Sequence, residues 1–141
     1  LGEFSMKAFL WASIALALSV GTAAAEQFDG SVPMACKPLK GHDCLPTQDN
    51  CSPLKPESDK DKNAELGIDV AKKQVKSPFR TSLLPIQHTT QNRESLVLQG
   101  ADLQFAWSTV INRTTGAMTL TIADRKGAYI VFGQCRLAEK K

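Results

Sequence analysis

The feature that most restricts the fold of this chain is a period-two alternation of apolar and polar residues in its second half. It is clearest in residues 105–124, FAWSTVINRTTGAMTLTIAD, where Trp107, Ile111 and Met118 alternate with polar neighbours. Successive side chains of a β-strand point to opposite faces, so the pattern predicts strands that each bury one face. Similar alternations, broken by turn residues, recur over residues 64–137 and predict an antiparallel sheet.

Residues 112–116, NRTTG, separate two of these strands and have the composition of a tight turn. The side chain of Asn112 can hydrogen-bond the turn backbone, and Gly116 adopts a positive φ without steric cost. We therefore predict a hairpin here, and not a recognition or catalytic loop. The triplet at 112–114 also matches an N-glycosylation site, but nothing else in the sequence favours that use.

These patterns predict an all-β domain of roughly six or seven short antiparallel strands, joined mostly to their sequence neighbours. Pro85 marks an edge strand or a bulge. The final run, AYIVFGQC, has β-forming residues at both parities and predicts a strand buried on both faces. A meander that closes into a small barrel or half-barrel would remove exposed edges, and a two-layer β-sandwich is the alternative.

The N-terminal region has the pattern of a secretory signal peptide. Residues 1–5 precede a Met-Lys start, and we interpret them as a cloning remnant. Residues 6–25 contain one lysine, an apolar run over 8–20 and a small-residue end, AAA. As a helix this run would extend about 20 Å, short of the ~30 Å bilayer core. We expect cleavage after Ala25, no stable membrane span thereafter, and a periplasmic or secreted protein.

Four cysteines follow the predicted signal peptide, and an even number in an exported chain predicts two disulfides. The sequence leaves the connectivity open. We favour Cys44 with Cys51, which closes a short loop. The other pair would then be Cys36 with Cys135, which joins the N-terminal arm to the last strand and is worth ~4–5 kcal/mol in the chain-entropy model. The alternative is a metal site built from the following residues: Cys36, His42, Cys44 and Cys51. It lacks the spacing of structural zinc sites, so we expect no metal.

The mature chain changes composition near residue 63. Residues 26–63 contain three of the four cysteines and five of the seven prolines, and they have few large apolar residues. We expect an irregular, disulfide-braced arm over 26–63, a β domain over 64–137 and a charged tail over 138–141.

No catalytic motif is found in the sequence. It has no Gly-x-Ser-x-Gly elbow, phosphate-binding glycine loop, His-Glu-x-x-His helix or Cys-x-x-Cys pair, and its only histidines are His42 and His88. We therefore expect a protein that is not an enzyme and uses no cofactor. The net charge of +3 is spread along the chain and predicts no nucleic-acid binding.

Large aromatic residues of the last three strands are the other candidate site: Phe105, Trp107, Tyr129 and Phe132. In a small β domain such rings most often fill the core. In a barrel that is open at one end, some of them would instead line an apolar pocket. The partner would then be a small apolar ligand or another protein.

Several landmarks of the chain, FDGSVPMAC, LGIDVAKKQV, LVLQG and the closing VFGQC, resemble those of small exported alphaproteobacterial proteins of unknown function. The resemblance implies the same fold and a periplasmic location, and it assigns no site residues. From the residues we predict a non-catalytic binding or structural protein. The alternatives are a secreted enzyme inhibitor, by fold analogy with the disulfide-braced β-barrels that inhibit lysozyme, and an unrecognised hydrolase.

Overall fold

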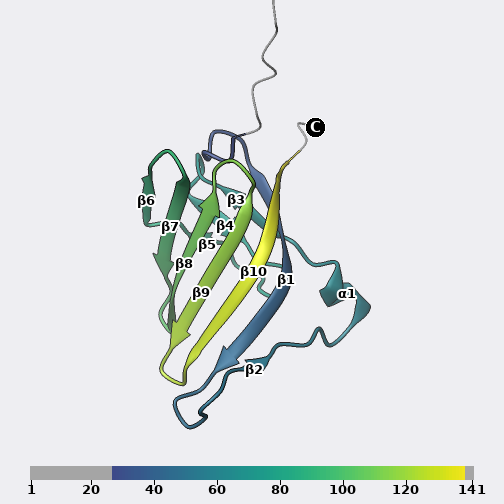
Figure 1. The fold of residues 1–141 in the computed structure, drawn as a ribbon. Coiled ribbons are helices and arrows are strands. Elements are labelled where there is room, and N and C mark those ends of the chain that lie inside the picture. The colour runs from purple at the N-terminus through teal and green to yellow at the C-terminus, as the bar shows by residue number, and fades with distance from the viewer. Residues whose placement is uncertain (1–26, 139–141) are drawn as a thin grey trace, which may run out of the picture.

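In the computed structural model, which describes residues 27–138, ten strands form one curled antiparallel sheet (Figure 1). The strands are β1 (Met34–Cys44), β2 (Ser52–Pro53), β3 (Leu66–Asp69), β4 (Gln74–Lys76), β5 (Leu84–Pro85), β6 (His88–Gln91), β7 (Ser95–Ala101), β8 (Phe105–Asn112), β9 (Ala117–Asp124) and β10 (Ala128–Leu137). The predicted all-β half-barrel is confirmed, with more strands than expected because several are only two to four residues long. The predicted signal peptide and residues 139–141 lie outside the described residues.

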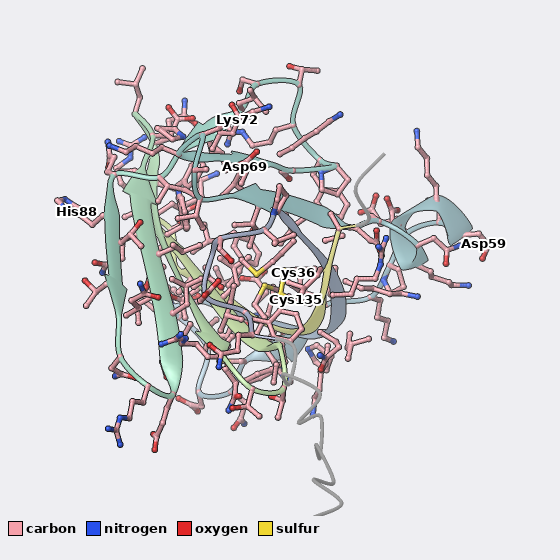
Figure 2. All side chains as sticks on the ribbon, turned by 90° about the horizontal axis from the view of Figure 1, so that it is seen from above. Cys36, Asp59, Asp69, Lys72, His88 and Cys135 are labelled. Carbon is pink, nitrogen blue, oxygen red and sulfur yellow. A yellow bond between two sulfur atoms is a disulfide. The ribbon has the colours of Figure 1, made fainter. Side chains whose placement is uncertain are left out.

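The sheet runs in the order β5-β4-β3-β1-β10-β9-β8-β7-β6, with β2 paired to β1 at the side. Its two ends meet where β5 passes into β6. The Ile86 N–H donates to the Lys73 carbonyl and the Gln87 N–H to the Gln99 carbonyl, each at 2.9 Å, so consecutive residues bond to opposite ends of the sheet. Seen from above, the strands consequently form a ring around the core (Figure 2).

The ring is incomplete along one side of β1. Over its length β1 pairs with β10, but on its other side it pairs with β3 only through Met34–Cys36 and with β2 only through His42 and Asp43. The intervening stretch, Lys37–Gly41, has no partner strand on that side. The short helix α1 (Asp59–Lys62) lies outside this gap (Figure 1). The half-barrel therefore has an opening between β3 and β2, along the stretch of β1 that has no partner strand.

The expectation of an irregular arm over residues 26–63 was wrong. This region supplies β1, which is central in the sheet and the longest strand, as well as β2 and α1. Pro38 is tolerated because it lies in the stretch without a partner strand on one side, and the register against β10 shifts between Pro38 and Lys40. Proline is confined to such edges and bulges because it has no N–H for the ladder.

Both disulfides have the favoured connectivity. Cys36 is bonded to Cys135 and Cys44 to Cys51, and no described cysteine is free. Cys36 and Cys135 face each other across β1 and β10, and their sulfur atoms lie inside the ring of strands (Figure 2). The Cys44–Cys51 bridge instead closes the short loop between β1 and β2.

The core fills the end of the ring that holds the β8–β9 hairpin. The predicted turn is confirmed: Gly116 has φ 74°, and Asn112 Oδ1 accepts the N–H groups of Thr114 and Thr115 at 2.9 Å. Phe28, which is 4% exposed, packs against this turn, and its N–H donates to the Arg113 carbonyl at 2.9 Å. Fully buried side chains of this end include Met34, Cys36, Leu96 and Ile111. One end of the half-barrel is thus closed.

One detail of the predicted packing was wrong. The last strand is not buried on both faces, because Phe132 lies on the outer face of β10 and is 43% exposed. Leu103 also has the parity of Phe105 and Trp107, but it is fully exposed because it belongs to the β7–β8 turn and not to the strand. Alternation therefore identified the inner face but not where each strand begins.

We predict that the two disulfides differ in their contributions to stability. The Cys36–Cys135 bridge spans 99 residues and the Cys44–Cys51 bridge spans 7. In the chain-entropy model, Cys36→Ala/Cys135→Ala should lower the free energy of unfolding by about 4–5 kcal/mol and Cys44→Ala/Cys51→Ala by about 2–3 kcal/mol. Urea unfolding of both variants measures the difference. Equal losses would contradict the assignment of Cys36–Cys135 as the main brace.

We also predict that Gly116→Val destabilises the domain. A Cβ at this position would lie 2.7 Å from the Cys135 carbonyl oxygen and 2.7 Å from the Phe28 ring, in a backbone conformation that β-branched residues resist. The expected loss is at least about 1 kcal/mol. The control is Gly67→Val, where the nearest atom, Lys76 Cβ, is 3.6 Å away. A Gly116→Val melting temperature as high as that of the control would be inconsistent with this turn.

Candidate functional site

The open end of the half-barrel contains an apolar cavity of about 370 Å³. Its walls come from the inner faces of β3, β4, β8 and β9 and from the connection between β4 and β5. Leu66, Ile68, Val75, Leu120 and Ile122 supply most of the apolar lining. Protein cores are packed with few voids larger than a water molecule, so a hollow of this size is a candidate binding site.

A second hollow adjoins the cavity on the side where β1 has no partner strand. This groove, of about 680 Å³, lies between Lys37–Gly41 of β1 and the segment Leu54–Lys62. Leu54 covers Gly41 there, and its N–H donates to the Gly41 carbonyl at 2.9 Å. The residues shared by the cavity and the groove are Leu66, Ser77, Phe79, Leu120, Ile122 and Tyr129. The cavity and the groove therefore adjoin each other, and these six side chains form their common border.

The connection between β4 and β5, residues 77–83, forms a flap at the mouth of the cavity. Its Phe79 is 63% exposed although it lines both hollows. Arg80 attaches the flap to the opposite wall: its guanidinium donates to Asp102 Oδ2 at 2.8 Å and lies 4.7 Å from the centre of the Phe105 ring. Ser77 Oγ accepts the Phe79 N–H at 3.2 Å and shapes the turn at the base of the flap.

Trp107 lies at the inner wall of the cavity and is 6% exposed. Its indole packs over Gly100, the residue opposite it on β7, where a Cβ would come within 2.7 Å of Nε1. Glycine at 100 is therefore required for the ring to lie against the sheet. The buried Nε1–H has no hydrogen-bond partner among residues 27–138. Because Trp107 lines the cavity, a molecule bound there would contact its side chain.

Three of the four predicted pocket residues are brought together. Phe105, Trp107 and Tyr129 line the cavity, and Tyr129 also lines the groove. Phe132 does not line either, because it belongs to the outer face of β10. The flap and the groove were not predicted. The sequence signal that could have indicated an apolar mouth is Phe79, which is 63% exposed and lines both hollows.

The polar residues considered for catalysis do not form a cluster. His88 lies on the exposed strand β6, and its side chain points away from the interior of the half-barrel (Figure 2), whereas His42 lies on β1. Within the described part of the chain, no group of three or more His, Cys, Asp or Glu side chains is placed to hold a metal ion. In the same part, no helix has the length and apolar character needed to cross a membrane.

Comparison with known proteins finds no match: no protein-family model, curated protein or solved structure is similar to this chain. The functional interpretation therefore depends on the geometry of the site.

We predict that the Arg80–Asp102 contact restrains the flap. Arg80→Met keeps the length of the side chain but removes its charge, so the amide hydrogens of residues 77–83 should exchange several-fold faster. The free energy of unfolding should change by less than about 1 kcal/mol, because both partners are partly exposed.

Arg136→Met is the matched control, since it breaks a similar ion pair with Glu65 outside the flap. Hydrogen exchange measured by mass spectrometry compares the two variants. Equal exchange in residues 77–83 of both variants would show that Arg80 does not hold the flap.

Proposed function

We propose that the protein is an exported, non-catalytic carrier that binds a small apolar molecule in the open interior of its half-barrel. The observation that carries this proposal is the apolar cavity of about 370 Å³, which is within the usual range of ligand-binding sites. A domain of this size needs its apolar side chains for a core. Leu120 and Ile122 border a hollow, so they make fewer packing contacts than they would in a filled core, which lowers stability. Ligand binding is a function that would offset this cost.

An exposed apolar residue at the mouth of the cavity supports a guest of the same character. Phe79 of the flap lines both the cavity and the groove and is 63% exposed. An enzyme inhibitor would be expected to present a rigid, polar loop to its target, whereas this side chain gives an apolar surface at an opening. The cavity walls are mostly apolar. The Thr109 hydroxyl, a polar group of the lining, already donates a hydrogen bond to the Thr119 carbonyl oxygen at 3.2 Å. Both features favour binding of an apolar molecule over the inhibitor and hydrolase alternatives.

Two disulfides support a periplasmic or secreted location for this carrier. Such bonds persist in oxidising compartments and are rare in the cytosol. The predicted signal peptide at residues 6–25 would deliver the chain there.

We predict that the protein binds 1-alkanols with an affinity that rises with chain length. Burial of each added CH₂ is worth ~0.8 kcal/mol, so affinity should increase by up to about fourfold per carbon until the cavity is filled, and then level off. Isothermal titration calorimetry over a series from six to fourteen carbons, in the concentration range below alkanol aggregation, measures this trend. In the mature chain that follows the predicted cleavage after Ala25, Trp107 is the only tryptophan, and its emission should change in step with the calorimetric signal.

The matched control is Leu120→Phe/Ile122→Phe, which places two larger side chains in the region shared by the cavity and the groove. This variant should keep the strand-dominated circular dichroism spectrum and lose most of the binding. Binding that is unchanged in the variant, or that is absent from the unmodified protein, would refute the proposed function.

A further inference from the structure

The groove beside the cavity differs from it in charge. Its lining includes four lysines, Lys37, Lys40, Lys55 and Lys62, and two carboxylates, Glu57 and Asp61. The cavity, in contrast, is lined by a single cation and a single carboxylate, Arg80 and Asp124. Positive charge is therefore in excess at the groove and balanced at the cavity.

The charges at the cavity already have partners within the protein. Arg80 donates to Asp102 at 2.8 Å. Asp124 Oδ1 accepts the N–H groups of Lys126 and Gly127 at 2.7 and 3.0 Å in the β9–β10 turn. These groups are used to hold the flap and to form a turn, so the cavity offers a guest mainly apolar contacts.

Most of the lysines at the groove, in contrast, have no ionic partner among the residues that the structure describes. Lys62 Nζ lies 2.7 Å from Asp59 Oδ1, and Asp61 Oδ2 accepts the Ser58 hydroxyl at 2.8 Å. Lys37, Lys40 and Lys55 make no salt bridge with any residue of the range 27–138. All three lysines line the groove, where the carboxylates are Glu57 and Asp61, so positive charge remains in excess there.

The apolar and the cationic regions are connected by the shared residues, among them Leu120, Ile122 and Tyr129. A flexible chain could therefore lie in the cavity, pass these side chains and end among the lysines. An apolar tail gains from burial, and an anionic end group gains from the nearby cations. A neutral or cationic end group would not be attracted to these lysines.

We propose that the natural guest is a single-chain amphiphile with an anionic head group, bound with its tail in the cavity and its head among Lys37, Lys40 and Lys55. This inference rests on the proposed function, since it requires that the cavity binds an apolar chain. It adds the chemical class of the ligand and the orientation in which it binds.

The test compares three ligands that share a twelve-carbon chain and differ in the head group: laurate, 1-dodecanol and dodecyltrimethylammonium. Calorimetry at pH 8, at concentrations that avoid micelles, should give an affinity order of laurate, then dodecanol, then the cation. We expect laurate to bind about tenfold more tightly than dodecanol at low salt, with a smaller difference in 0.5 M NaCl because salt screens exposed charges.

The charge-reversal variant Lys37→Glu/Lys40→Glu/Lys55→Glu should reduce laurate affinity about tenfold and leave dodecanol affinity within about twofold. The matched control is Lys72→Glu/Lys76→Glu/Arg93→Glu, which makes the same change in net charge at residues that line neither the cavity nor the groove. This control should bind laurate nearly as well as the unmodified protein. An unchanged dodecanol affinity in both variants also shows that they fold.

The two proposals fail in different ways. If none of the three ligands binds, the carrier function itself is refuted. If dodecanol or the cation binds at least as tightly as laurate, the carrier function stands and the anionic head group is refuted. An equal loss of laurate binding in the two triple variants would likewise overturn the assignment to Lys37, Lys40 and Lys55, because it would reflect net charge alone.

Discussion

The pairing of β1 with β10, fixed by the buried Cys36–Cys135 disulfide, is the constraint on which the rest of the structure depends. It joins the first and last strands over their whole length and turns a linear meander into a curled sheet. With β1 in place, β3 has a partner strand, and β4 and β5 can extend the sheet from β3. The closure at Ile86 and Gln87 then brings the two ends of the sheet together. Without β1 beside β10, the β6–β10 meander would have an exposed edge and no second wall.

The same strand also creates the opening. β3 pairs with only three residues of β1 and β2 with only two, so Lys37–Gly41 is left without a partner strand on one side. Proline and lysine at an open edge hinder the addition of further strands, and Pro38, Lys37 and Lys40 meet this need. In the proposed carrier, Lys37 and Lys40 have a second role as partners of an anionic head group. A single structural feature would thus protect the edge and select the ligand.

The division between the closed and the open end follows from the distribution of large side chains. Phe28, Met34, Leu96 and Ile111 fill the end near the β8–β9 hairpin, where the disulfide is also found. At the other end, the side chains of Leu120, Ile122 and Tyr129 are too few to fill the space between the walls, and the flap with Phe79 covers it only in part. A packed core and a cavity therefore lie side by side within one sheet.

What the sequence determined by itself is local. Alternation fixed the inner face of the strands, Asn112 and Gly116 fixed the hairpin, and the cysteines favoured the observed bridges, because each depends on neighbouring residues or on simple loop closure. The tertiary structure alone decided that the proline-rich region forms a central strand, that Phe132 lies outside, and that residues 77–83 form a flap. These outcomes depend on which strand lies next to which. A cavity and a groove are spaces between segments distant in sequence, so no local pattern specifies them.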